Sequence, residues 1–176
     1  MTIIDTFIER NKHFADQHVH QSLSIMPKLK TMIIGCVDPR VDPVEILGLE
    51  PGEAIVIRNV GGRVTPSAMQ TLGLLSMVTP STTTSDPEQP WHIIVLHHTD
   101  CGIRRIEHNA PDMLASFFGI PKEQLDSKAV NDPRVAVMID VTALKANPAT
   151  QRRFVILGMV YDVTTGLVEV IVPPAS

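Results

Sequence analysis

Four short apolar segments recur along the chain, and segments of helical pattern separate them. The apolar segments cover residues 32–35, 54–57, 93–96 and 154–160. Runs of this length are typical of strands that are buried on both faces of a sheet, as parallel strands are. Strands that alternate with helices predict an α/β fold, with a mostly parallel central β-sheet, flanking helices and right-handed crossovers.

The helices are expected at about 3–21, 44–47, 66–78, 111–119 and 132–145, where apolar residues recur at helical spacing. Near the C-terminus, Thr164-Thr165-Gly166 predicts a turn into an antiparallel edge strand over 167–172. Residues 79–90 are rich in Ser, Thr, Pro and acidic side chains, which predicts an exposed connection. A chain of 176 residues fits one domain over 1–176.

Composition excludes several classes of function. The chain has 15 Lys and Arg against 19 Asp and Glu, a formal charge of -4, and its basic residues form no patch of the kind that binds a phosphate backbone. No apolar run reaches the roughly 20 residues that span a bilayer, and no signal-peptide pattern opens the sequence. We therefore expect a cytoplasmic protein that binds neither nucleic acid nor membranes.

The chain has two cysteines, Cys36 and Cys101, which are too few for a disulfide framework. Cys36 follows the first expected strand, while His98 and Cys101 follow the third. Because the carboxyl ends of parallel strands meet at one edge of a sheet, these side chains are expected to lie close together. Two thiolates and an imidazole suit Zn²⁺, and three protein ligands leave a fourth position open, as in catalytic zinc sites. A helix that begins at Ile103, after Gly102, would favour the Cys101 thiolate.

Three motifs around these residues resemble the signatures of the β-class carbonic anhydrases. Residues 36–40 read Cys-Val-Asp-Pro-Arg and resemble C-x-D-x-R, residues 58–62 read Arg-Asn-Val-Gly-Gly and resemble R-N-x-G, and residues 98–102 read His-Thr-Asp-Cys-Gly and resemble H-x-x-C-G. Their order and spacing agree with the short form of that family. The resemblance implies one zinc ion per chain, with Cys36, His98 and Cys101 as its ligands.

The resemblance also implies that Asp38 and Arg40 form the catalytic dyad. A carboxylate two residues from a metal ligand could take the open coordination position, whereas the guanidinium fork of Arg40 would hold it off the metal. Asp38 could then accept a hydrogen bond from zinc-bound hydroxide. In some members of the family this Asp ligates zinc and closes the site, so both states are open here.

Five residues are candidates for the substrate pocket and its loop. They are Asn59, Gly61, Gly62, His97 and Gly102. The glycine pair matches no phosphate-binding motif, and it predicts a loop whose backbone approaches the metal site closely. His97 stands where the family usually has glycine, so it could reshape the pocket, move protons or simply pack under the sheet.

The implied function is the reversible hydration of CO2 to bicarbonate and a proton by zinc-bound hydroxide. Because two thiolates offset the charge of Zn²⁺, activity is expected to rise with pH from neutral to mildly alkaline, and a flat profile of kcat/KM would contradict this. One alternative is hydrolysis of carbonyl sulfide or carbon disulfide at the same site. Another is a zinc-binding or redox-sensing protein without catalysis. The family also implies a homodimer or higher homo-oligomer, with the helix at about 3–21 in the dimer contact.

Overall fold

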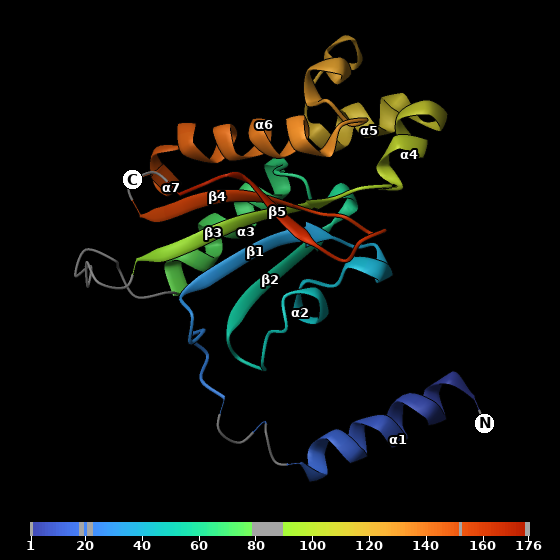
Figure 1. Ribbon diagram of the computed structural model, residues 1–176, viewed down its shortest axis with the longest axis vertical. Helices are drawn as coiled ribbons and strands as arrows, with labels where there is room; N and C mark the ends of the chain where they lie inside the picture. The colour runs from blue at the N-terminus through green and yellow to red at the C-terminus, as the bar shows by residue number, and fades with distance from the viewer. Residues whose placement is uncertain (1, 18–19, 21–22, 79–89, 152, 175–176) are drawn as a thin grey trace.

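The protein is seen here in a computed structural model, which describes residues 2–17, 20, 23–78, 90–151 and 153–174. The strands in this part of the chain form one five-stranded sheet in the order β2-β1-β3-β4-β5 (Figure 1). The first four strands are parallel, and β5 pairs antiparallel with β4 at the edge. This confirms the expected α/β class. The strands are β1 (Thr31–Cys36), β2 (Ala54–Asn59), β3 (Trp91–His98), β4 (Phe154–Tyr161) and β5 (Val168–Val172).

The helices also follow the sequence pattern, with two differences. The first helix ends at Asp16 instead of continuing to about 21, and residues 18, 19, 21 and 22 lie outside the described residues. The connection expected at 79–90 lies outside them too, apart from Pro90. Two short elements, η5 and α7, had not been expected. The helices are α1 (Ile3–Asp16), α2 (Pro43–Ile46), α3 (Pro66–Val78), α4 (Ile103–Asn109), α5 (Pro111–Phe118), α6 (Pro133–Ala146) and α7 (Pro148–Gln151), with 3₁₀ turns η2 (Pro39–Val41), η3 (Val60–Gly62) and η5 (Lys122–Lys128).

The main core lies between one face of the sheet and the helices α3 and α6. Successive strand residues point to opposite faces of a sheet, so alternate residues of β1 and β3 contribute to this core. Its fully or almost fully buried members include Met32, Ile34, Leu72, Ile93, Val95, Val137, Val141 and Leu144. His97 shares the face of Ile93 and Val95, and it therefore lies beneath α6, whereas His98 belongs to the opposite face.

A second, smaller core joins α4, α5 and η5 beyond the carboxyl end of β3. Its buried members are Ile103, Leu114, Ala115, Phe118, Leu125 and Val130, and Cys101 packs partly against them. This cluster fixes the chain that follows Cys101. The main core thus packs on one side of the carboxyl edge of the sheet, and the second core packs on the other.

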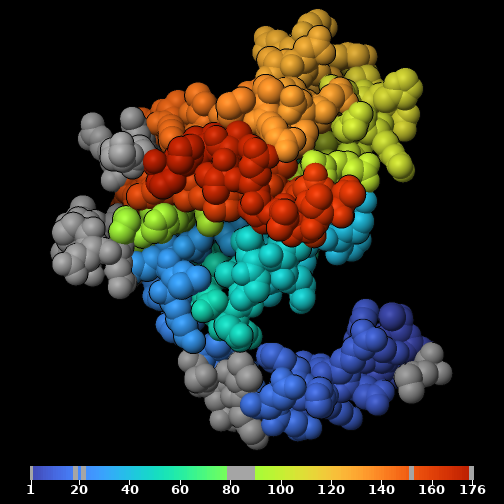
Figure 2. All heavy atoms as spheres, in the orientation of Figure 1, coloured from blue at the N-terminus to red at the C-terminus, as the bar shows by residue number. Residues whose placement is uncertain are grey.

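Helix α1 stands away from the sheet (Figures 1 and 2). Thr2 and Asp5 form a capping box at its N-terminus, an arrangement that stabilises helix starts. None of residues 3–16, all of which the structure describes, is buried, and the apolar side chains of Ile4, Phe7 and Ile8 are 51% to 65% exposed. The amphipathic pattern of this helix therefore has no partner surface within the described part of one chain. No helix in that part has both the length and the apolar character needed to cross a bilayer.

Candidate active site

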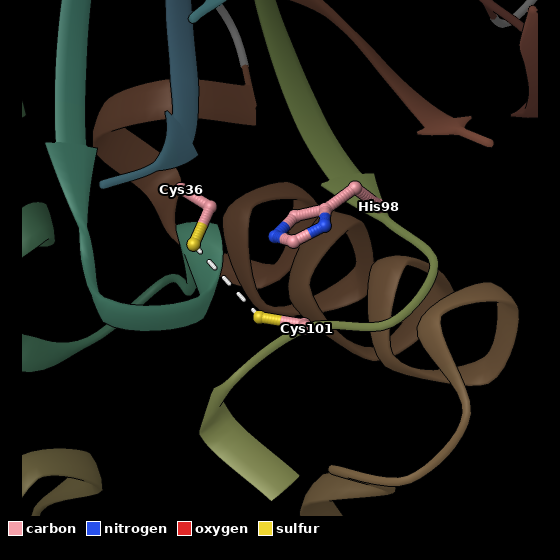
Figure 3. A group of neighbouring side chains, drawn as sticks. All are labelled: Cys36, His98 and Cys101. Carbon is pink, nitrogen blue, oxygen red and sulfur yellow. Dashed lines mark hydrogen bonds between the residues drawn. The ribbon is translucent and has the colours of Figure 1, made fainter. Parts of the chain in front are cut away.

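Two neighbouring strands bring the three expected metal ligands together. Cys36 is the last residue of β1, His98 is the last residue of β3, and Cys101 lies in the turn between β3 and α4 (Figure 3). Their donor atoms all lie within 4.8 Å of one another, and the two sulfur atoms are 3.8 Å apart. Two sulfurs bound at about 2.3 Å to one tetrahedral zinc ion would be about 3.8 Å apart. The spacing therefore fits this ion.

The imidazole of His98 is oriented for metal binding. Its Nδ1 atom donates a hydrogen bond to the carbonyl oxygen of Thr99 at 2.8 Å, which leaves the lone pair on Nε2. Nε2 is buried and has no hydrogen-bond partner among the residues that the structure describes. Figure 3 shows the ring turned toward the two sulfurs. A buried nitrogen without a partner is costly, and a metal ion held between these residues would satisfy it.

The two thiols differ in how readily they ionise. The hydrogen bond from the Cys101 thiol lowers the pKa of Cys36 to about 4, against the effect of burial, and His98 and the amide of Asp38 add to this. The pKa of Cys101 is raised because its thiol faces the Cys36 sulfur and is itself buried. Without a cation the pair thus holds one negative charge. A divalent cation would supply the positive charge that a second thiolate requires.

Asp38 and Arg40 form an ion pair beside this donor group. The Arg40 guanidinium donates to Asp38 through Nη2 at 2.7 Å and through Nε at 3.1 Å, and the Arg40 amide adds a hydrogen bond at 2.9 Å. These hydrogen bonds lower the pKa of the Asp38 carboxyl to about 2. Asp38 is therefore an anion at neutral pH, and its two oxygens face Arg40.

Asp100 also binds Arg40, and sequence reasoning had assigned it no role. Its carboxylate accepts a hydrogen bond from Arg40 Nη1 at 2.9 Å, and its carbonyl oxygen accepts one from Nη2 at 3.1 Å. Asp100 has a positive φ of 54°, a conformation in which Asp is enriched. Its place inside the H-x-x-C motif was a signal, but the direction of its side chain depends on this backbone conformation. Arg40 thus links the turn after β1 to the turn after β3.

Arg58 holds the turn after β1 from the other side. It donates from Nε to the carbonyl oxygen of Cys36 at 2.9 Å and from Nη2 to that of Asp38 at 2.8 Å, and it forms an ion pair with Asp42. The family motif contained Arg58, but its contacts could not be read from the motif. One guanidinium thus binds two carbonyl oxygens and one carboxylate, and these contacts fix the path of residues 36–42.

The expected pocket loop lies directly against Cys36. Asn59 closes it through two hydrogen bonds with the backbone of Arg63, both 2.7 Å long. Gly61 and Gly62 have positive φ values of 76° and 64°. A Cβ atom on Gly62 would lie 3.0 Å from the backbone nitrogen of Cys36. The loop therefore needs glycine at this position for both conformation and space.

The remaining two pocket candidates lie in different surroundings. Gly102 has a right-handed φ of -62°, and a Cβ atom there would meet no described heavy atom within 4 Å, so this backbone does not demand glycine. His97 is only 3% exposed, and its Nε2 atom lies 3.3 Å from Oδ2 of Asp140 in α6. Its ring is therefore closed off from solvent beneath α6.

Comparison with known proteins agrees with this geometry. The carbonic anhydrase family profile matches residues 31–119. β-Carbonic anhydrase 1 of Mycobacterium tuberculosis is 28% identical over 179 residues, which cover 98% of this chain and 100% of that protein. The crystal structure of carbonic anhydrase from Streptococcus mutans has a TM-score of 0.73 and 30% identity, over 97% of this chain and 98% of that one.

The fold is thus shared with a carbonic anhydrase over almost the whole chain, and in this chain the carboxyl edge of the sheet carries the Cys, His and Cys donor group. The chain belongs to the β-carbonic anhydrase family, which consists of zinc enzymes. It is also similar to the carbon disulfide hydrolase of Saccharolobus solfataricus, at 32% identity over 110 residues that cover 62% of this chain and 48% of that protein. The relatives therefore include both hydration and hydrolysis enzymes.

Proposed function

We propose that this protein catalyses the zinc-dependent, reversible hydration of CO2 to bicarbonate and a proton. The observation that carries the proposal is the buried donor group of Cys36, His98 and Cys101 next to the Asp38–Arg40 ion pair. One zinc ion per chain, held by these three side chains, would supply the positive charge that lowers the pKa of a water molecule.

The ion pair prepares Asp38 for a specific task. Because Arg40 engages both oxygens of the ionised carboxylate, Asp38 is held toward Arg40 and away from the role of a fourth ligand. An ionised carboxylate is a strong hydrogen-bond acceptor. Asp38 would accept a hydrogen bond from the reacting water and orient it toward the carbon of CO2. Correct orientation of the reactants removes a large part of the entropic barrier.

Hydrolysis of carbonyl sulfide or carbon disulfide is the second candidate. The similarity to the carbon disulfide hydrolase of Saccharolobus solfataricus favours it, and these substrates share with CO2 a linear, uncharged molecule with an electrophilic carbon. A zinc-binding protein without catalysis is less well supported, because the Asp38–Arg40 ion pair is formed although such a protein would have no use for it.

The test is a paired assay on one preparation of known zinc content. Initial rates of CO2 hydration and of sulfide release from carbonyl sulfide and carbon disulfide are compared, with Cys101→Ser as the blank. Fast hydration with negligible sulfide release supports the proposal. Efficient sulfide release with feeble hydration overturns it in favour of the hydrolase, and a zinc-loaded protein with neither activity overturns both.

We also propose that residues 1–176 act as one domain that forms a homodimer or a larger homo-oligomer in the cytoplasm. The exposed apolar side chains of α1 support this, because an uncovered apolar face of that kind marks an interaction site. A second copy of the chain carries the same exposed apolar helix, and it is the partner that we propose. Two carbonic anhydrases of Sordaria macrospora with the same fold are tetrameric. The two free cysteines fit a reducing compartment.

A further inference from the structure

Three polar side chains are buried together beneath the carboxyl edge of the sheet. They are Arg63 in the segment after η3, Asp140 in α6 and His97 in β3, which are 1%, 2% and 3% exposed. Buried charges persist only where other groups neutralise them and satisfy their hydrogen bonds. The proposed reaction gives this cluster no task.

Asp140 is the centre of the cluster. Its carboxylate accepts hydrogen bonds from Arg63 Nε at 2.8 Å, from Arg63 Nη2 at 3.2 Å and from the amide of Val64 at 2.9 Å. His97 Nε2 lies 3.3 Å from the same carboxylate. Arg63 is held further by the carbonyl oxygen of Lys128, and its guanidinium lies 4.9 Å from the ring centroid of Phe118. The carboxylate thus holds the segment after η3 by hydrogen bonds and lies in contact with the imidazole of His97, whose Nε2 forms no hydrogen bond with the residues that the structure describes.

The first segment supports Cys36. Asn59 and the backbone of Arg63 close the glycine loop between them, and Gly62 in that loop packs against the backbone of Cys36 and against the carbonyl oxygen of Leu96. A shift of Arg63 would therefore move the loop on which Cys36 rests.

The second segment carries His98. His97 is the residue before it in β3, and its side chain points to the opposite face, beneath α6. Figure 1 shows α6 lying across β3 and β4. Asp140 therefore contacts, from one helix, the loop that packs against Cys36 and the residue that precedes His98 in β3.

We propose that Asp140 is a positioning residue for the metal centre, which it supports through Arg63 and His97. The inference rests on the zinc site of the proposed function. Removal of the charge on Asp140 would loosen the spacing of the donor atoms while leaving every ligand in place. Replacement of a group that hydrogen-bonds directly to a metal ligand typically lowers metal affinity by about 10-fold to 100-fold, and Asp140, which acts through one intervening residue, is expected at the lower end of that range.

The test measures zinc affinity instead of activity. The zinc dissociation constant of Asp140→Asn is determined by competition with a chelating dye, and the visible spectrum of the Co²⁺-loaded protein reports the geometry of the donors. The control is Leu144→Ala, which lies one turn further along α6, is fully buried and has no polar side-chain atom. We expect Asp140→Asn to weaken zinc binding by about 10-fold or more and to alter the cobalt spectrum. Leu144→Ala should lower the unfolding free energy but leave both unchanged.

A second variant covers the case in which Asp140→Asn does not fold because Arg63 is left as a buried, unpaired charge. Arg63→Met combined with Asp140→Asn removes both charges, which proteins tolerate well. This double variant should fold and still bind zinc about 10-fold more weakly than the wild type. Wild-type affinity in the folded variants, or an equal loss in Leu144→Ala, would overturn the inference. Failure of the wild type itself to bind zinc would overturn the proposed function as well.

Discussion

At the scale of single residues, the environment of Asp38 is set by one guanidinium that serves two carboxylates. Arg40 donates to Asp38 and to Asp100 at the same time. Arg40 and Asp100 are open to solvent, with side chains that are 49% and 70% exposed, whereas the side chain of Asp38 is 15% exposed. The contact with Asp38 is therefore the better protected of the two. The two carboxylates should differ in importance accordingly.

Replacement of Arg40 by alanine tests the first contact. The pKa of Asp38 should rise from about 2 toward the ordinary value of about 4, so the carboxyl stays ionised at pH 7. Activity should nevertheless fall, by about 10-fold to 100-fold in kcat/KM, because the carboxylate is no longer held in one orientation. Stopped-flow hydration assays on variants of equal zinc content measure this. An unchanged kcat/KM would show that the Asp38–Arg40 ion pair does not contribute to catalysis.

Replacement of Asp100 by asparagine tests the second contact. An exposed ion pair contributes about 0 to 1 kcal/mol, so kcat/KM should fall by no more than about 5-fold, and the difference should shrink at high salt. Asp112→Asn is the matched control, because Asp112 pairs with Lys122 on an exposed surface of α5. A loss of kcat/KM as large as that in Arg40→Ala would show that Asp100 contributes more to catalysis than its exposure indicates.

At the scale of elements, the four parallel strands could be predicted because each contains a short apolar run, and the ligands because they follow two of these runs. Local pattern could not place Arg63 opposite Asp140, since these residues lie far apart in the sequence and meet only when α6 packs on the sheet. It also extended the first helix beyond Asp16, because apolar spacing continues where the helix ends. Contacts made by tertiary packing are the part that sequence reasoning missed.

The glycine loop provides a prediction at this scale. Gly62→Ala should lower the free energy of unfolding by about 1 to 3 kcal/mol, because alanine is strained at positive φ and its methyl group would press on the backbone of Cys36. Gly73→Ala is the control, since Gly73 lies inside α3 and a Cβ there meets no described atom within 4 Å. That change should stabilise the protein by about 0.5 to 1 kcal/mol. Both variants are measured by urea denaturation. Equal changes in the free energy of unfolding would contradict the inference that position 62 requires glycine.

At the scale of the whole molecule, the described part of one chain leaves the apolar side of α1 uncovered. The triple replacement Ile4→Ser, Phe7→Ser and Ile8→Ser should therefore convert an oligomer into a species of 19.3 kDa. Light scattering after size-exclusion chromatography measures the mass. Replacement of Glu9 and Lys12 by serine changes polar positions of the same helix and should leave the mass unaltered. An oligomer that survives the triple replacement would show that another surface forms it.

The stability of the molecule should also depend on pH through Asp140. Burial raises the pKa of this carboxyl, but His97 and Arg63 outweigh it, so the pKa in the folded protein is lowered. A lowered pKa stabilises the fold above the ordinary value of about 4, and this contribution is lost as pH falls through the folded value. The unfolding free energy of the wild type should thus decline below about pH 4. Asp140→Asn, measured by denaturant titration at each pH, should decline less over that interval, and an equally steep decline would exclude Asp140 as a cause.

The Cys, His and Cys group also has a topological consequence. Cys36 and Cys101 enclose all of α2, β2, α3 and β3, so an ion bound to both would act as a removable cross-link around a loop of more than sixty residues. Closing a loop of that length restricts the unfolded chain far more than the folded one. Zinc would therefore act as a reversible cross-link around more than a third of the chain, and the availability of the metal would affect the stability of the fold as well as the proposed activity.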